Sequence, residues 1–333
     1  MNVWQIAAGE RGRNYSSLCL KHDLALIGPG DPGPYPKSEI HYKNKSQVKN
    51  FCREPKPGDL VLLRLYHDVV GVGLIPEGED NQYRWCEDFD DVLGWDLQHT
   101  RRVLWDPEAI AILQDMQPVF GNHKQQPTFT AVRESRILER APHLKGSVKP
   151  RALKELPTVE RALPDEALGI QLFAAGLANE SIEDVIAVLR KIRRLASWYE
   201  QGACGVKRPN EHEIVAHAVV PLMLGLGWSE QLLAVEWNRV DVAFFDRPPT
   251  NEENCIAVLE AKRLGSPIED TYKQAENYVK SLNLSRCKVI ITTDGMRIFV
   301  YHRQADGWPD HPTGYANFAK MRIRHAIPEN TSA

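Results

Sequence analysis

The chain has 333 residues, enough for about two domains that each bury a core of their own. Hydrophobic residues make up 43% and charged residues 26%, which excludes a disordered or fibrous protein. The formal net charge of −3 does not exclude nucleic acid, because binding needs positive potential only along the path of that partner. The start of the sequence is not a targeting segment and no apolar run could span a bilayer, so we expect a cytoplasmic protein without membrane contact.

The six cysteines lie far apart, and no two of them form a C-x-x-C pair. This spacing predicts neither a zinc site nor a disulfide framework. We therefore expect buried thiols, as in cytosolic proteins.

Residues 1–107 alternate short β-type runs with clusters of Gly, Pro and Asp. The run Leu24–Ile27, for example, precedes the turn-rich residues 28–34. This alternation predicts a small, mostly β barrel as the N-terminal domain. Residues 108–165 are polar and punctuated by proline, which predicts a connector.

Residues 166–327 are predicted to form an α/β domain with a central mixed sheet. Apolar residues recur at helical spacing from Ser181 to Tyr199, and a second helix is predicted from Asn210, a suitable N-cap, to Leu226. The remainder alternates strand, strand, helix and strand.

Two apolar runs, residues 240–246 and 256–262, predict adjacent buried strands joined by a hairpin loop. Glu260 and Lys262 are two residues apart and therefore share one face of their strand. Asp241 interrupts an apolar strand, where a charge is costly unless it is paired or holds a metal. Phosphodiester hydrolysis needs a hard cation held by oxygen ligands and a group that orients or deprotonates water. Asp241 and Glu260 suit the first role and Lys262 the second.

The motifs around these residues occur in a recognisable order. An acidic helix start at residues 209–213 precedes a Gly227-Trp228 pair, and Gln274 and Tyr278 follow on one helical face. A further strand and an aromatic strand complete the series at residues 288–301. Together these motifs resemble the nuclease domain of type I restriction enzyme motor subunits, a branch of the PD-(D/E)xK nuclease superfamily.

This resemblance implies a role for each residue of the motif. Asp241 and Glu260 would bind Mg²⁺, or alternatively Mn²⁺, and Lys262 would position the attacking water. Glu211 would be the acidic residue of the first helix, and Gln274 would contact the site or the DNA backbone.

Glu213 competes with Glu211 for the role on the first helix. Glu211 shares a helical face with Val215 and Val219, which favours it. The sequence holds no G-x-x-x-x-G-K-(S/T) loop and therefore no ATPase motor of that type.

Four segments of the N-terminal half also occur in a recognisable order: residues 3–10, 24–28, 56–61 and 99–105. They resemble the EVE and YTH branch of PUA-like domains, particularly the versions fused to restriction nucleases. The resemblance implies an aromatic cage for a modified base turned out of the stack. The cage candidates are Trp4, Tyr15, Trp85 and Trp95.

The two halves together predict a type IV-like, modification-dependent restriction endonuclease that cuts double-stranded DNA with Mg²⁺ in defence against foreign or phage DNA. Two strand cuts need two active sites, so we expect a homodimer at least on DNA. Two alternatives stay open. One is an RNA-directed nuclease, since YTH and PUA relatives often bind RNA, and the other is a catalytically inactive binding protein.

Overall fold

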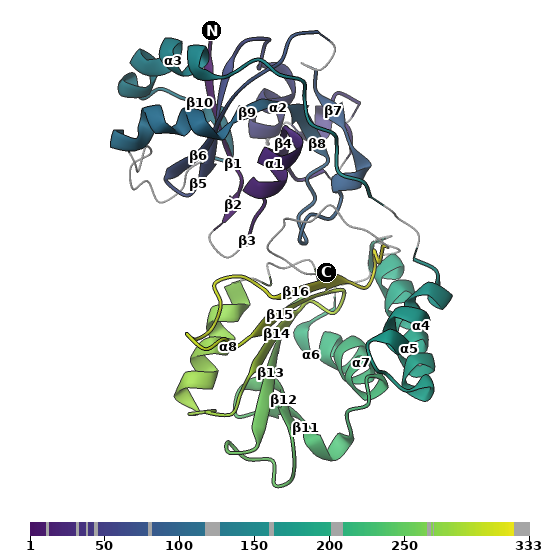
Figure 1. Cartoon of the computed structure of the whole chain (residues 1–333). Coiled ribbons are helices and arrows are strands. Elements are labelled where there is room, and N and C mark those ends of the chain that lie inside the picture. The colour runs from purple at the N-terminus through teal and green to yellow at the C-terminus, as the bar shows by residue number, and fades with distance from the viewer. Residues whose placement is uncertain are drawn as a thin grey trace. The chain divides into compact units, whose positions relative to one another are not determined.

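The structure is a computed structural model in which the chain divides into two compact units (Figure 1). Unit 1 contains Met1–Val159 and unit 2 contains Glu160–Ile323. The described residues are 1–10, 13–30, 33–37, 39–42, 46–78, 82–116, 127–159, 163–200, 209–264, 268 and 270–322.

Unit 1 is built mainly from short strands with a few helices. Its strands are β1 (Val3–Ala7), β2 (Gly9–Glu10), β3 (Arg13–Asn14), β4 (Leu24–Ile27), β5 (Leu60–Leu65), β6 (Asp68–Leu74), β7 (Arg84–Trp85), β8 (His99–Arg102), β9 (Leu104–Asp106) and β10 (Phe129–Ala131). Its helices are α1 (Ser16–His22), α2 (Ser46–Arg53), α3 (Ser135–Ser147) and the 3₁₀ segments η1 (Glu39–Tyr42), η3 (Glu87–Phe89) and η4 (Pro107–Met116).

The described strands of unit 1 form a five-stranded sheet in the order β10-β1-β5-β6-β9, a three-stranded sheet in the order β4-β8-β7, and the pair β2-β3. Strand β5 is buried on both faces, because Leu60 and Leu62 pack in one hydrophobic cluster while Val61 and Leu63 pack in another. A closed barrel is not evident among these strands. The predicted barrel is therefore not confirmed, and a sheet covered on both faces takes its place.

Residues 108–159, expected as most of a connector, belong to unit 1. Leu113 of η4 and Ile137, Ala141 and Leu144 of α3 join the hydrophobic cluster that covers one face of the five-stranded sheet. The α3 residues recur at helical spacing, but prolines around them obscured the pattern.

Unit 2 consists of a helical layer, a six-stranded sheet and one further helix. The helical layer holds α4 (Asp165–Ala174), α5 (Asn179–Glu200), α6 (Glu211–Ile214), the π-helical turn η6 (Val215–Val219) and α7 (Val220–Gly225). The 3₁₀ segment η7 (Glu230–Leu232) leads into the strands β11 (Leu233–Trp237), β12 (Val240–Phe245), β13 (Cys255–Ala261), β14 (Val289–Thr293), β15 (Arg297–His302) and β16 (Gly314–Asn317), with α8 (Asp270–Ser281) between β13 and β14.

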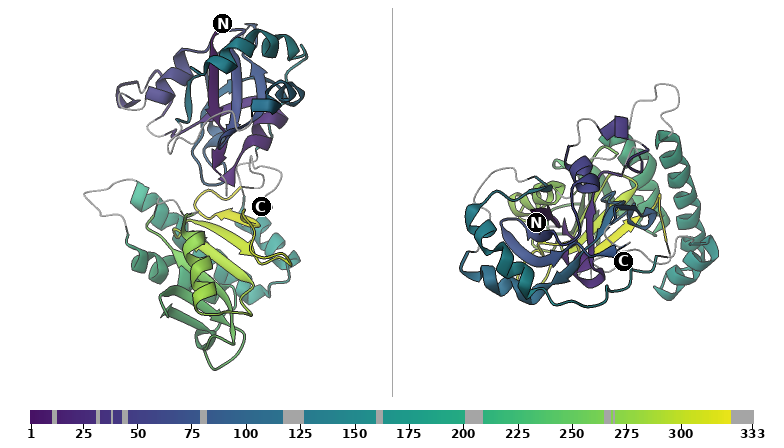
Figure 2. Two further views of the ribbon diagram at one scale, coloured as in Figure 1. Left: turned by 90° about the vertical axis from the view of Figure 1, so that its left-hand side faces the viewer. Right: turned by 90° about the horizontal axis from the view of Figure 1, so that it is seen from above.

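The sheet of unit 2 follows the order β11-β12-β13-β14-β15-β16. Strands β13 and β14 are parallel and the other neighbours are antiparallel, so the predicted mixed sheet is present. Figures 1 and 2 show α8 lying along one face of this sheet, with α5 to α7 on the other. Val242, Phe244 and Leu259 pack toward the α5–α7 layer. Because side chains alternate along a strand, Asp241 and Glu260 face α8.

Helix α5 confirms the predicted amphipathic stripe. Val185, Leu189 and Ile192 are buried against the core of unit 2, whereas Arg190 and Arg193 both bond Asp165 on the outer side. Across the described part of the chain, no helix combines the length and the apolar character that crossing a membrane requires.

The turn between β14 and β15 touches the helix that carries Glu211. Gly295 has φ +85°, and a Cβ atom there would lie 2.9 Å from Cγ2 of Ile214 in α6. The position therefore requires glycine for its backbone conformation and for this close approach.

We expect Gly295→Ala to destabilise the protein by about 1–3 kcal/mol, through backbone strain and overpacking against Ile214. Gly176→Ala is the matched control, since Gly176 has φ +94° and a Cβ atom at that position would meet nothing within 4 Å. Chemical denaturation of both variants measures the difference. Equal losses would show that the contact with Ile214 contributes nothing.

Candidate active site

The sheet brings Asp241 and Glu260 together on neighbouring strands. Val242 of β12 pairs with Leu259 of β13, so Asp241 and Glu260 are the next residues along this register. Oδ2 of Asp241 accepts a hydrogen bond from the backbone N–H of Ala261 at 2.7 Å. The two carboxylates therefore meet on the face that α8 covers.

Both carboxylates are held in an environment that disfavours their charge. Glu260 is 1% exposed, and burial together with the Asp241 charge raises its pKa to about 8. Burial also raises the pKa of Asp241, although the Ala261 N–H works in the opposite direction. A divalent cation between them would reverse this penalty, since two negative groups would face a positive one.

The donor set suits a hard cation. Carboxylate oxygens are the preferred protein ligands of Mg²⁺, which commonly binds through one or two of them together with water and substrate phosphate. Oε1 of Glu260 is buried without a hydrogen-bond partner and is available for such a bond. No group of three or more His, Cys, Asp and Glu arranged to hold a metal occurs within the described residues.

Lys262 lies just beyond the end of β13. Its backbone N–H donates to the carbonyl of Thr293 at 2.8 Å, and its Nζ lies 3.9 Å from Oε1 of Glu211. Glu213 instead closes a capping box with Asn210, accepting the Asn210 N–H at 2.7 Å. Of the two competing acids on this helix, Glu211 is therefore the one beside Lys262.

Gln274 connects α8 to the carboxylate pair. Its Nε2 donates to Oε2 of Glu260 at 3.2 Å and to the hydroxyl of Tyr278, one helical turn later, at 3.1 Å. The structure thus brings all five predicted catalytic residues, Glu211, Asp241, Glu260, Lys262 and Gln274, into one neighbourhood of unit 2. Thr292 was not among the site residues predicted from the sequence, although Thr292 pairs with Glu260 in the β13–β14 register. The available signal was the pair of threonines at the end of the otherwise apolar strand β14, since polar residues there could point into a site.

Two of the four proposed cage residues are part of the core of unit 1. Trp4 is 7% exposed, stacks on Phe129 and donates its indole N–H to Asp59 at 3.0 Å. Tyr15 is 3% exposed, and its hydroxyl donates to the carbonyl of Ala7. Both side chains are therefore used in packing, which argues against a contact with a base.

The other two candidates are only half buried. Trp95 packs edge-on against Tyr15, and Trp85 packs edge-on against His99, with ring centroids 5.1 Å apart. His99 is itself buried between the hydroxyls of Tyr42 and Tyr83, at 2.9 and 3.0 Å from its two ring nitrogens. This aromatic cluster around His99 was not predicted, because its members are spread from residue 42 to residue 99.

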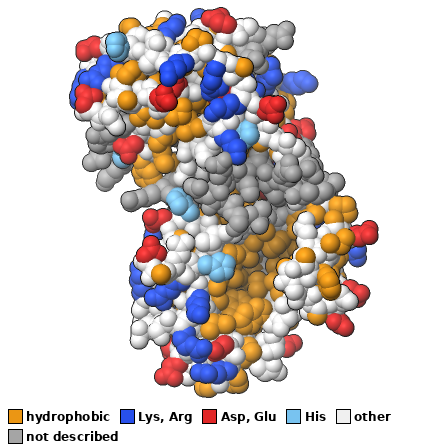
Figure 3. Space-filling view, viewed as in Figure 1, with side chains coloured by type: hydrophobic (Ala, Val, Ile, Leu, Met, Phe, Trp, Pro, Cys, Tyr) orange, Lys and Arg blue, Asp and Glu red, His pale blue; other side chains and the backbone are white. Residues whose placement is uncertain are grey.

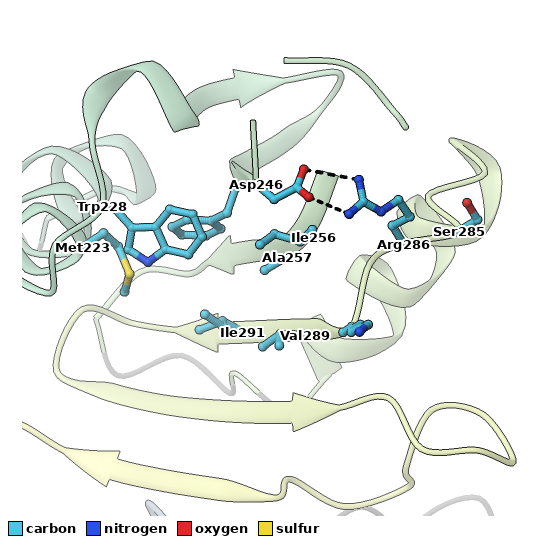
Figure 4. Close-up of a pocket in the computed structure, with 11 residues that line it drawn as sticks. Met223, Trp228, Asp246, Ile256, Ala257, Ser285, Arg286, Val289 and Ile291 are labelled. Carbon is cyan, nitrogen blue, oxygen red and sulfur yellow. Dashed lines mark hydrogen bonds and ion pairs between the residues drawn. The ribbon is translucent and has the colours of Figure 1, made fainter. Parts of the chain in front are cut away.

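A pocket of about 640 Å³ lies on the opposite face of the unit 2 sheet (Figure 4). Trp228, Phe244 and Ile291 are among its apolar lining, and hydrophobic side chains gather in a hollow of this unit in Figure 3. Its acid, Asp246, is paired with Arg286 at 2.5 Å. The pocket therefore offers an apolar surface, and the acidic chemistry lies on the α8 face.

No protein-family model matches the chain, and no curated protein matches it. Among solved structures, the chain is similar to the X-ray crystal structure of protein Atu2648 from Agrobacterium tumefaciens. The identity is 18%, the match covers 47% of this chain and 100% of that one, and the TM-score is 0.24. A likeness at this TM-score supports no conclusion about fold or function.

The pKa of Glu260 predicts how stability changes with pH in the absence of divalent cations. A folded-state pKa of about 8, against an ordinary 4.5, means that the folded protein holds this proton more tightly than the unfolded chain. The resulting stabilisation is complete below pH 4.5 and is lost as the pH rises through 8. Relative to Glu260→Gln, the wild type should lose up to about 1.4 kcal/mol per pH unit in this window.

Denaturation of both proteins in a chelator at about pH 6 and about pH 8.5 measures this difference. Glutamine keeps the shape of the protonated acid and cannot ionise, so it is the matched control. Parallel pH dependences would show that Glu260 titrates normally.

Proposed function

We propose that the protein is a Mg²⁺-dependent endodeoxyribonuclease of the modification-dependent, type IV-like restriction class. The observation that carries the proposal is the adjacent pair Asp241 and Glu260, with Lys262 two residues further on and Gln274 bonded to Glu260. These residues come from three elements of unit 2: β12, β13 with the residue just beyond its end, and α8. Phosphodiester hydrolysis needs these groups together.

Each residue has a distinct task in the proposed reaction. Asp241 and Glu260 would hold Mg²⁺, which when bound supplies the positive charge that stabilises the phosphate as it is attacked. Gln274 holds Oε2 of Glu260 and so fixes the direction of the carboxylate. Lys262 is 23% exposed at its side chain, and its ammonium is therefore available to orient the attacking water. Oε1 of Glu211 lies 3.9 Å from this ammonium and helps to position it.

We expect Lys262→Ala to reduce the rate of Mg²⁺-dependent DNA cleavage by about 100-fold or more, because the water loses its orienting group. Lys273→Ala is the matched control, since Lys273 is an exposed lysine paired with Glu276 on α8. Single-turnover cleavage of plasmid DNA at fixed Mg²⁺ measures both. Cleavage by Lys262→Ala at the wild-type rate would contradict the assigned role.

Unit 1 is proposed to read the modified base. Trp85 and Trp95 are the supporting residues, since their half-buried rings retain exposed area for stacking on a base turned out of the duplex. Trp85 is braced by His99, which the neighbouring tyrosine hydroxyls hold in place. Trp4 and Tyr15 are not included, because core packing occupies them.

Binding should depend on both the base modification and Trp85. Matched duplexes carrying cytosine, 5-methylcytosine, 5-hydroxymethylcytosine or glucosylated cytosine are compared in Ca²⁺, which prevents cutting. We expect one modified duplex to bind more tightly, and Trp85→Ala to lose about tenfold in affinity for it, because base stacking contributes about 1–3 kcal/mol. Trp85→Phe should retain most of that affinity, whereas Trp198→Ala, which changes an exposed tryptophan of unit 2, should have no effect.

The same duplexes, together with modified RNA of matching sequence, separate the remaining alternatives. Equal binding of all four would remove the reader function and leave the nuclease. Cleavage of modified RNA in preference to DNA would favour the RNA-directed enzyme. A protein that stays monomeric on saturating DNA and still makes double-strand breaks would contradict the proposed homodimer.

A further inference from the structure

Thr292 lies beside Glu260 on the next strand of the sheet. Strands β13 and β14 are parallel, and Glu260 is in register with Thr292. Registered residues of neighbouring strands point to the same face, so both side chains are directed toward α8. They are 1% and 0% exposed, respectively.

Each of these two side chains has a buried oxygen without a hydrogen-bond partner. These atoms are Oε1 of Glu260 and Oγ1 of Thr292. The other carboxylate oxygen of Glu260 is already held by Gln274. A buried polar atom without a partner costs about 1–3 kcal/mol. Two such atoms on residues that are in register on neighbouring strands point to a third group that both could bind.

The neighbouring residue, Thr293, shows what a structural threonine does in this strand. Its Oγ1 donates to the carbonyl of Arg297 at 2.6 Å and accepts the N–H of Gly295 at 2.9 Å. Thr293 therefore completes the β14–β15 turn with both its donor and its acceptor. Thr292 makes no such turn contact among the described residues, although it is one position away and equally buried.

We propose that Thr292 is a positioning residue of the cation site, whose hydroxyl binds the hydrated cation held by Glu260 and thereby fixes Oε1 of that carboxylate. The identity of the cation as Mg²⁺ or Mn²⁺ rests on the proposed function. In this arrangement Gln274 of α8 holds one oxygen of the Glu260 carboxylate, and Thr292 of β14 holds the other through the hydrated cation. Residues that orient metal ligands in this way commonly change metal affinity by about 10- to 100-fold.

The test measures binding of Mn²⁺ alone to the full chain by titration calorimetry, without nucleic acid. Thr292→Val keeps the size of the side chain and removes the hydroxyl, and it should weaken Mn²⁺ binding by about tenfold or more. Thr292→Ser restores the hydroxyl and should bind within about threefold of the wild type. Without Mn²⁺, Thr292→Val should be at least as stable as the wild type, because it removes an unpaired polar atom.

Thr293→Val provides the contrasting control. It should lower stability, because the turn loses two hydrogen bonds, yet leave Mn²⁺ affinity within about threefold of the wild type. Wild-type affinity in Thr292→Val, or equal loss of affinity in Thr292→Ser and Thr292→Val, would overturn the proposal.

Glu260→Gln separates this inference from the proposed function. Loss of Mn²⁺ binding in this variant locates the cation at Glu260, and the role of Thr292 then stands even if the wild type cuts no nucleic acid. Unchanged Mn²⁺ binding in Glu260→Gln would overturn the role of Thr292, whatever the protein cuts.

Discussion

The cost of burying Asp241 beside Glu260 is the constraint on which the site in unit 2 depends. Two other buried acids are neutralised by arginine: Arg151 bonds both oxygens of Asp23 at 2.6 and 2.7 Å, and Arg297 donates twice to Asp294. Asp241 and Glu260 instead accept hydrogen bonds from a backbone N–H and a glutamine amide, and no arginine among the described residues donates to either. This difference agrees with the proposed cation site, since an arginine would occupy the same oxygens.

The sheet of unit 2 supports this arrangement from both faces. On one face, apolar residues of β12 and β13 pack against the α5–α7 layer and fix the strands. On the other face, α8 delivers Gln274 to Glu260. The turn at Gly295 contacts Ile214, so the position of α6, and with it Glu211, is tied to the end of β14. The site is therefore held by elements far apart in the sequence.

Unit 2 was the more predictable of the two units, because its sequence signals are local. Strand alternation alone placed Glu260 and Lys262 on one face, and the N-cap signal at Asn210 located α6. The sequence favoured Glu211 over Glu213 because of its helical face. In the structure, Glu213 closes the capping box with Asn210, whereas Glu211 lies 3.9 Å from the Lys262 ammonium.

Unit 1 was less predictable because its core forms through long-range contacts. The sequence offered Trp4 as a candidate for stacking on a base. Its partners in the core, Phe129 and Asp59, come from distant segments, so its burial could not be read from the residues around it. The segment after α3 is similar: Arg151 and the Lys154 N–H bind the carboxylate of Asp23, more than a hundred residues earlier. Because this stretch is polar and rich in proline, its composition predicted a connector, although it docks on unit 1 through these bonds.

The raised pKa of Glu260 links two properties that respond to pH in opposite directions. Below pH 8 the carboxyl tends to keep its proton, which relieves repulsion with Asp241 and stabilises the cation-free protein. A cation bound at the proposed site would displace that proton, so its affinity would rise with pH while the cation-free state becomes less stable. The proposed positioning roles of Thr292 and Gln274 apply at this point, because a carboxylate that loses its proton on binding would need to be held already in the direction of the metal.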